Sequence, residues 1–570
     1  MRKALLIIIS LFTVLSMLLV GCAPAPSQAP EATKAPEVPA ATTPDRTTKA
    51  PAPTEVPTAA GPVKIKVFIH AQGDIDYSTN KFTLLLEKKF NVNFEWQVVP
   101  MDATGAKEAR NLSLASGDYP DLYIMNQDLD LFTQNEMLKY GQQGVLLPLN
   151  DLIDKYAPNV KAHLEKYPYY KANAVAPDGK IYGIPQLEEC YHCSFENKLW
   201  ANTKWMKQLN IEMPKTTAEF KALLEAFKTK DPNGNGKEDE VPLSGTTESF
   251  GFRVVPYLMN AFIYDDDRAH LMIDNGKVDS AANKPEWKEG LLYIKSLYDA
   301  GLIDPGAFTQ DGSALSKIGN NDPQILGASA AMGPWFTSLA DGSKYGTDYN
   351  VIPPLTGPKG VSFATLNPIK AGGASFVLTN KASKEVQIAA MKIVDYMSTL
   401  EGFLNGRFGE KGVSWRDPLP GEVALNKDIQ PLYAGIPLAK DEKPRNDSWG
   451  NTANYDWPKE VFGGWVQDTN IYISIGFERR LWQATTLYDG HQPKETYPYY
   501  AVWTDPKNVD EAALLQLNII NYIDQNSLQF ITGTKDINKE WDSYVAGLDK
   551  LDLKRFLEIC QHSYDASFKK

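Results

Sequence analysis

The clearest chemical signature in this sequence is a short polar loop, DPNGNGKEDE, at positions 231–240. Asp231, Asn233 and Asn235 occupy alternate positions, so a curled loop can turn their side-chain oxygens toward one centre. The two glycines of the loop permit the positive φ angles that a tight curl requires. Calcium takes about six to eight hard oxygen ligands. The first half of the loop therefore matches the calcium-binding pattern of an EF-hand.

The second half of the loop departs from that pattern. An EF-hand places a bidentate Glu at its twelfth position, but that position falls on Pro242 here, and the following VPLSGTTES has no helical pattern. Two carboxylates and a backbone carbonyl stand within the loop to complete a ligand set. The alternative is an Asn-Gly turn that holds no ion. We predict a structural Ca²⁺ site held by Asp231, Asn233 and Asn235, to which the Lys237 carbonyl and one of Asp239 and Glu240 can be added.

The N-terminal end predicts export and lipid attachment. Arg2 and Lys3 precede an apolar run from Ala4 to Val20, and the ending Leu-Val-Gly-Cys resembles the bacterial lipobox. In such signals the chain is cut before the cysteine, which then carries the lipid. We predict a lipoprotein signal peptide over 1–22 with lipidation at Cys22. The alternative is an uncleaved membrane anchor, for which the run is slightly short.

Residues 23–62 are rich in Pro, Ala and Thr and carry almost no large apolar side chain. Such a segment buries too little surface to offset its ordering entropy. We predict a disordered, semi-stiff spacer that lifts a folded body away from a membrane. The roughly 500 residues that follow exceed what one core supports, so at least two lobes are expected.

Composition narrows the function classes. The formal net charge of −12 argues against nucleic acid as a partner. The six histidines are scattered, and the sequence contains no HExxH, GxSxG or GxxxxGK motif. The 12 Trp and 27 Tyr suit stacking on sugar rings, although a large core uses aromatic residues too. An exported glycoside hydrolase or polysaccharide lyase, which needs two carboxylates in a cleft, remains an alternative.

The cysteines leave one question open. Cys190 and Cys193 flank His192 in ECYHC, and Cys560 stands alone near the end. A single CxxC without a second pair is a poor zinc signature. The alternatives are a local disulfide, two buried thiols, or metal or redox chemistry, and export permits the disulfide.

The first part of the folded body alternates strands and helices, which predicts a parallel sheet covered by helices. Ligands of such sheets bind beyond the carboxyl ends of the strands, where Asn126 and Gln127 fall. Further helices are marked by a capping box at Thr216 and Glu219 and by apolar stripes. The expected early elements are strands at Val63–Ala71, Asn91–Pro100 and Asp121–Met125 and helices at Asn80–Phe90 and Ala106–Ala115.

Several segments together resemble the bacterial extracellular solute-binding proteins, family 1. They are LSLASGDYPDLYIM (112–125), DGKIYGIPQ (178–186), ENKLWANTKWMKQLNIEMPKTTAEF (196–220), AAMGPWF (330–336) and the C-terminal stretch 529–559. Their order covers essentially all of Val63 to Lys570. The calcium-loop variant resembles that of the alginate-oligosaccharide binding proteins, a long branch of this family. That resemblance implies the full set of calcium ligands, which is Asp231, Asn233, Asn235, the Lys237 carbonyl, Asp239 and Glu240.

The resemblance implies an α/β fold of the periplasmic-binding-protein type II class, in which two lobes close on a solute in a hinged cleft. It also implies a body built from discontinuous segments. The expected lobes are 63–185 with 370–440, and 186–369 with 441–570, the second holding the calcium loop 231–240.

The resemblance further implies a solute site made of aromatic faces and planar polar groups. Trp335, in the GPW segment, is the expected stacking residue, with a core position as the alternative. Four arginines (Arg407, Arg416, Arg479 and Arg480) are available for a charged sugar, so the charge of the solute stays open. The candidate solute-binding residues are Trp335, Trp415, Arg416, Asn126, Gln127 and Gln186.

The function predicted from these features is that of a binding protein rather than an enzyme. A lipid-anchored monomer on the extracellular face of the cell membrane would capture an oligosaccharide and pass it to the permease subunits of an ABC importer. Peptide binding or a sensor role on the same fold are the further alternatives.

Overall fold

The computed structural model describes residues 61–248, 251–367, 372–439 and 441–568. The predicted signal peptide, the lipidation site Cys22 and most of the predicted spacer lie outside these residues. Among the helices of the described part, none is long and apolar enough to cross a membrane.

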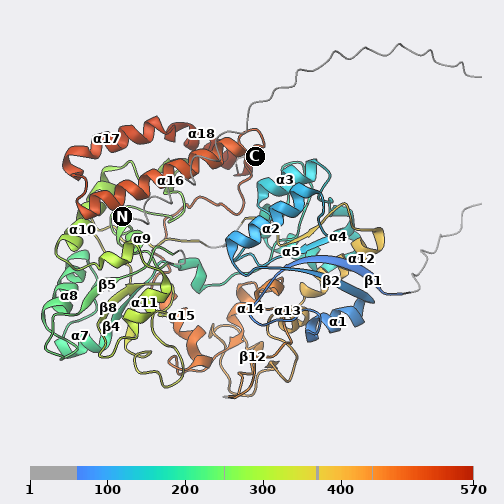
Figure 1. Ribbon diagram of the computed structural model, residues 1–570, viewed down its shortest axis with the longest axis horizontal. Coiled ribbons are helices and arrows are strands. Elements are labelled where there is room, and N and C mark those ends of the chain that lie inside the picture. Colours follow the sequence, from blue (N-terminus) through green and yellow to red (C-terminus); the bar gives the residue numbers. More distant parts are fainter. Residues whose placement is uncertain (1–60, 249–250, 368–371, 440, 569–570) are drawn as a thin grey trace, which may run out of the picture. The chain divides into compact units, whose positions relative to one another are not determined.

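The first sheet has the strand order β10-β3-β1-β2. The central β1 runs parallel to both of its neighbours, and β10 pairs antiparallel with β3. The connecting helices α1 and α2 are each started by a side-chain cap, Asn80 and Asp102 respectively. The predicted strand–helix alternation and parallel pairing are therefore confirmed (Figure 1). The bounds are β1 Val63–His70, α1 Lys81–Phe90, β2 Val92–Val99, α2 Ala103–Ser116, β3 Leu122–Ile124 and β10 Phe376–Leu378.

A segment far along the chain returns to this sheet. Helix α12 (Lys384–Met397) buries Ile393, Val394 and Met397 in the same apolar cluster as Ile65 and Val67 of β1. Trp449, Ala453 and Tyr455 join that cluster as well. The other helices of this part are α3 Gln134–Gln142, α4 Asn150–Tyr156, α5 Pro158–Lys166, α6 Pro168–Ala174 and α13 Leu400–Arg407.

The second sheet has the order β5-β8-β4-β9, with β5 and β8 parallel and β4 antiparallel to β8 and β9. The predicted capping box at Thr216 and Glu219 is present at the start of α8, whose apolar stripe is buried. The bounds are β4 Leu199–Asn202, β5 Val241–Ser244, β8 Leu326–Ala330, β9 Tyr349–Ile352, α7 Thr203–Leu209, α8 Thr217–Thr229, α9 Val254–Met259, α10 Pro285–Asp299 and α11 Gly312–Gly319.

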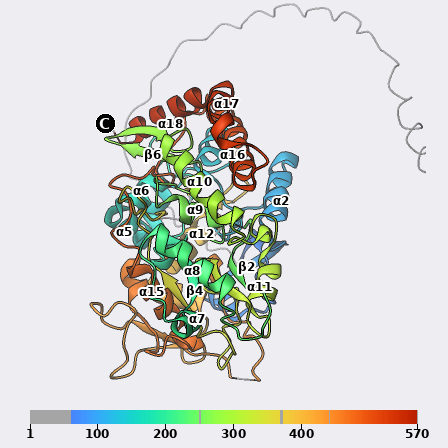
Figure 2. The same ribbon diagram turned by 90° about the vertical axis from the view of Figure 1, so that its left-hand side faces the viewer.

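Three C-terminal helices belong to the core of the second sheet. Helix α16 packs against α10 (Figure 1). The hairpin of β6 (Leu271–Asp274) and β7 (Lys277–Ser280) lies against α18, where Gln561 bonds the backbone of Gly276 and Val278 (Figure 2). The bounds are α16 Val509–Thr532, α17 Ile537–Lys550 and α18 Leu553–Phe568.

A small third sheet, in the order β11-β12-β13, has its own aromatic cluster, which contains Trp457 and Phe462. Both cysteines of the ECYHC segment belong to this cluster. The bounds of this part are β11 Trp415–Arg416, β12 Tyr433–Gly435, β13 Trp465–Val466, α14 Lys459–Gly463 and α15 Phe477–Thr486; the 3₁₀ turns of the chain are η1 His192–Phe195, η2 Pro305–Phe308, η3 Gly450–Ala453 and η4 Ser474–Gly476.

Candidate binding site and metal loop

The loop 231–240 curls tightly between the end of α8 and the start of β5. Asp231 accepts hydrogen bonds from the backbone N–H of Asn235 (3.1 Å) and of Gly236 (2.9 Å). The side-chain oxygen of Asn235 accepts from the N–H of Lys237 (2.8 Å). Gly234 and Gly236 both have φ of 72°. The curl expected from the alternating Asx residues and the glycines is therefore present.

Of the two carboxylates predicted as ligands in the second half of the loop, that of Asp239 contacts this curl. Asp239 accepts hydrogen bonds from the side-chain amides of Asn233 (3.2 Å) and Asn235 (3.1 Å). Both carboxylate oxygens of Glu240 are buried, with no hydrogen-bond partner among the described residues. Burial raises the pKa of Glu240, and the charges of Asp231 and Asp239 raise it further, so that together they outweigh the opposing effect of the nearby backbone N–H groups of Glu240 and Asn233. A buried carboxylate in this environment fits a hard divalent cation.

A polar network joins three segments beyond the carboxyl end of β3. Gln127 donates a hydrogen bond to Glu188 (2.7 Å), and Asn454 donates to the same carboxylate (3.0 Å). Gln186 donates to the backbone carbonyl of Asn451 (2.7 Å), and its own side-chain oxygen is buried without a partner among the described residues. Two of the predicted solute residues, Gln127 and Gln186, are therefore brought together.

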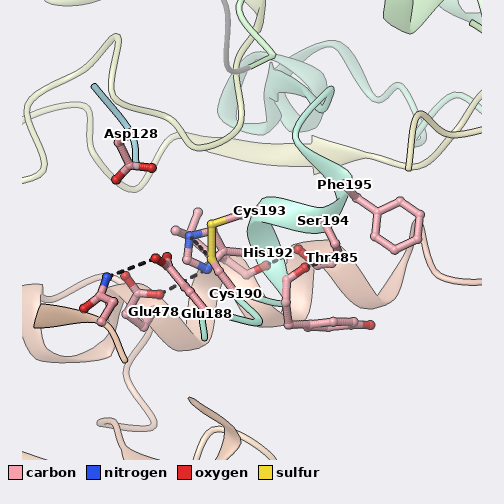
Figure 3. Close-up of a disulfide and its surroundings, with 12 residues drawn as sticks. Asp128, Glu188, Cys190, His192, Cys193, Ser194, Phe195, Glu478 and Thr485 are labelled. Carbon is pink, nitrogen blue, oxygen red and sulfur yellow. Dashed lines mark hydrogen bonds and ion pairs between the residues drawn. A yellow bond between two sulfur atoms is a disulfide. The ribbon is translucent and has the colours of Figure 1, made fainter. Parts of the chain in front are cut away.

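The ECYHC segment forms a disulfide between Cys190 and Cys193, which answers the question left open by the sequence. The disulfide holds the turn η1, so that His192 Nδ1 lies 3.2 Å from a carboxylate oxygen of Glu478. Figure 3 shows Asp128, Glu188 and Glu478 beside this disulfide. With both sulfurs bonded to each other, no thiolate of this segment is available to a metal.

Reducing this disulfide is expected to lower the free energy of unfolding by about 2 kcal/mol, because the bond closes only a short loop. Urea unfolding of a Cys190→Ser, Cys193→Ser double variant measures the loss. A matched Cys560→Ser variant controls for sulfur chemistry elsewhere, since Cys560 is a free, buried cysteine. Equal stability of the double variant and the wild type in oxidising buffer would contradict the prediction.

Arg407, the last residue of α13, contributes a cation to this region. Its guanidinium lies 5.5 Å from the ring centres of both Phe408 and Trp457. The Nε atom is buried and has no hydrogen-bond partner among the described residues. Burial lowers the pKa of Arg407, and the nearby charges of Glu188 and Glu478 oppose that effect. An arginine stays charged under these conditions, so its donors can serve a ligand.

A pocket of about 520 Å³ opens beside Phe408 and Glu478, two residues that interact with Arg407 but, unlike it, line the pocket. The aromatic rings of Phe408, Trp465 and Phe477 line it, together with the polar side chains of Gln467 and Glu478. The indole Nε1 of Trp465 and the side-chain oxygen of Gln467 are buried without partners among the described residues. Aromatic walls with unmatched polar atoms suit a ligand that has both apolar faces and hydroxyl groups.

Trp335 lies in the turn after β8, beside the same pocket. Its ring centre is 6.2 Å from that of Phe477 and 6.4 Å from that of Phe252. The side chain is 36% exposed, whereas Trp200 and Trp287 are fully buried. The accessible indole face is what a stacking role requires.

The remaining predicted solute residues have partners within the fold. Asn126 is buried, and its side-chain oxygen accepts from the N–H of Asp128 in a turn. Trp415 is buried and donates to Asn405 (3.1 Å). Arg416 makes a bidentate ion pair with Glu422 at 2.6 and 2.8 Å. None of the six predicted solute residues is among those that line the pocket at Trp465, so the binding role of all six stays a prediction.

Comparison with known proteins establishes the family. Residues 75–402 match the family model described as bacterial extracellular solute-binding protein, so this chain belongs to that family. The fructooligosaccharide ABC transporter substrate-binding protein FusA of Streptococcus pneumoniae is 30% identical over 490 residues, which cover 84% of this chain and 86% of FusA.

Solved structures agree with this assignment. FusA in complex with kestose has a TM-score of 0.67 at 28% identity, covering 88% of this chain and 99% of that one. A FusA EF-hand mutant in complex with fructo-nystose gives the same values. The alginate-binding protein AlgQ2 without calcium ion has a TM-score of 0.62 at 22% identity, covering 89% and 99% of the two chains. The predicted fold class, periplasmic-binding-protein type II, and the prediction of a transport binding protein rather than an enzyme are confirmed.

Proposed function

We propose that this protein captures an oligosaccharide and delivers it to the permease subunits of an ABC importer. The observation that carries the proposal is the pocket of about 520 Å³, whose aromatic walls carry the unpartnered polar atoms of Trp465 and Gln467. Trp335 supplies a further exposed aromatic face beside it. The named ligand of the relative FusA, a fructooligosaccharide, belongs to the same chemical class.

The charges around the pocket favour a neutral sugar over a uronate. The pocket lining carries two carboxylates, those of Asp447 and Glu478, and one guanidinium, that of Arg445, which pairs with Glu442 outside the lining. A sugar carboxylate would be repelled by this surplus of negative charge in a partly buried site. Neutral hydroxyl groups can donate hydrogen bonds to these two carboxylates.

We further propose that the loop 231–240 holds a structural calcium ion through the six ligands predicted from the sequence. The buried, unpartnered oxygens of Glu240 support this proposal. The existence of a FusA EF-hand mutant indicates that this relative has an EF-hand. The ion would join the end of α8 to the start of β5 by neutralising carboxylates from both sides of the loop.

The cellular setting is part of the proposal. The family is extracellular, and a lipid on Cys22 would hold the protein, as a monomer, on the outer face of the cell membrane with residues 23–62 as the spacer. The lobes would comprise 63–185 with 370–440 and 186–369 with 441–570. Trp449, Ala453 and Tyr455, which pack with the first sheet, would then link the second lobe to the first.

Isothermal titration of the protein starting at Val63 tests the function. The panel pairs neutral oligosaccharides, among them fructans and glucans, with uronate oligomers of equal length. We expect saturable binding of a neutral sugar without turnover, and at least about tenfold weaker binding of the uronates. Tight binding of a uronate alone would overturn the neutral class, and hydrolysis of a bound glycan would overturn the transport function.

A further inference from the structure

A second cavity, of about 200 Å³, lies among α9, α10 and α16 and shares no lining residue with the pocket at Trp465. Figure 1 shows α16 running past α10 and α9. Four residues of α16 face the cavity from one side of the helix, because they are spaced by three and four positions. They are Asp524, Ser527, Leu528 and Ile531.

Four polar atoms in the lining have no hydrogen-bond partner among the described residues. They are Asp265 Oδ2, Trp287 Nε1, Ser527 Oγ and Arg253 Nε. Asp265, Trp287 and Ser527 are 0%, 1% and 5% exposed. Buried polar groups are normally satisfied by protein atoms or ordered water, so four unmatched atoms in one lining indicate that the cavity holds a polar occupant.

The charged groups of the lining are already paired with one another. Asp265 Oδ1 lies 2.8 Å from His270 Nδ1, and Arg253 pairs with Asp267. Burial opposes the charge on His270, but Asp265 and Asp524 outweigh that effect and raise the pKa of His270 to about 10. The lining holds one carboxylate more than cations, but Asp524 is 50% exposed to solvent, so the occupant does not need to bring a charge.

A metal ion does not fit this lining. Asp265, Asp266 and His270 lie close enough to suggest one. However, Asp266 Oδ1 accepts hydrogen bonds from the backbone N–H groups of Arg268, Ala269 and His270. Its other oxygen accepts from the Tyr499 hydroxyl (2.6 Å). These bonds commit the Asp266 carboxylate to the loop.

The four unmatched atoms select among organic occupants. Asp265 Oδ2 can only accept, Trp287 and Arg253 can only donate, and Ser527 can do either. An occupant with a carboxylate would be repelled by Asp265. An occupant with an ammonium group would offer no acceptor to the N–H groups of Trp287 and Arg253. A hydroxyl group both donates and accepts, so it matches all four, while the side chains of Val254, Phe308 and Leu528 cover C–H surface.

We propose that this cavity binds a small neutral polyol of the size of a single sugar unit. The proposal is independent of the oligosaccharide function, because the two sites share no residue. A polyol held by α16 on one side and by Trp287 of α10 on the other would tie the C-terminal helices to the second sheet. Arg253 and Asp524, whose charged atoms are 3.9 Å apart and whose side chains are 31% and 50% exposed, mark its solvent side.

Calorimetric titration of the protein starting at Val63 with glycerol, D-glucose and myo-inositol tests the proposal. We expect saturable one-to-one binding of at least one probe. Ser527→Leu is expected to abolish it, because the added methyl groups fill the cavity, without lowering the melting temperature. Trp335→Ala, in the other site, is expected to leave it unchanged.

A second variant, Trp287→Phe, tests the proposal independently in case Ser527→Leu does not fold. Trp287→Phe removes the unpartnered N–H while keeping an aromatic ring, and it is expected to weaken the probe about fivefold. Trp541→Phe, at a buried tryptophan of the same core that does not line the cavity, is the matched control. Absence of saturable binding to the wild type below about 10 mM, or binding that Trp335→Ala abolishes and Ser527→Leu retains, would overturn the proposal.

Discussion

Glu240→Gln is expected to have opposite effects on stability with and without calcium. In calcium, the wild type gains binding free energy in the folded state, about 2.7 kcal/mol when the free ion is about 100 times its dissociation constant. The variant lacks the expected bidentate ligand and loses most of this gain, which lowers its melting temperature by a few degrees. In chelator the variant should have the higher melting temperature, because the amide that replaces the carboxylate carries no charge beside Asp231 and Asp239.

The reversal follows from the environment of this side chain. The Glu240 oxygens are buried without partners among the described residues, and its pKa is raised by burial and by two neighbouring carboxylates. Neutralising such a group relieves an unfavourable charge unless a cation compensates it. Differential scanning calorimetry measures the melting temperatures of the wild type and the variant. One buffer contains excess chelator, and the other contains free calcium at about 100 times the dissociation constant.

Glu238→Gln is the matched control for this experiment. Glu238 stands in the same loop but is exposed and is not among the expected ligands. Its melting temperature should follow that of the wild type in both buffers. If chelator leaves the wild type unchanged, or if the two variants behave alike, the loop is a polar turn without an ion.

Trp335→Ala is expected to weaken the oligosaccharide about thirtyfold while leaving the fold intact. The indole is 36% exposed and lies beside Phe477 of the pocket, so its removal costs little packing. Truncating a central aromatic contact typically costs about 2 kcal/mol of binding free energy, which corresponds to about thirtyfold in Kd. Titration with the neutral sugar identified from the panel measures the loss.

Two further variants test whether the loss of affinity comes from the aromatic face of Trp335. Trp335→Phe keeps an aromatic face and should recover most of the affinity. Trp415→Phe should instead lower the free energy of unfolding by roughly 1–3 kcal/mol, because it leaves the buried Asn405 oxygen without its donor. Full affinity in Trp335→Ala would remove this residue from the site, and a loss of affinity in stable Trp415→Phe would place that residue in it.

Much of the local structure followed from the sequence because its causes act over a few residues. The capping box at Thr216 and Glu219 satisfies backbone groups three positions apart, and it formed where predicted. The curl of 231–240 uses Asx side chains and backbone N–H groups at most five positions apart. The parallel order of β1, β2 and β3 followed from the strand–helix alternation.

The solute site was only partly predictable. Trp335, Gln127 and Gln186 were proposed from the family resemblance and from strand ends. None of them lines the pocket, although the ring of Trp335 lies beside Phe477, which does. Trp415 and Arg416 have the right side-chain types, but Asn405 and Glu422 occupy their polar groups. A residue type does not reveal whether its partners lie within the protein or in a ligand.

Glu188, Arg407 and Glu478 show what only the tertiary structure decided. They come from three distant segments, and no motif or spacing connects them. The packing of α13, the disulfide turn and α15 brings their charges within interaction range. Long-range packing also decides which buried polar atoms remain unmatched, because each match requires a partner from another segment. The sequence by itself therefore determined the class, the first three strands, several helices and the curl of residues 231–240. The charge and shape of the solute site came from the convergence of segments that only the folded chain brings together.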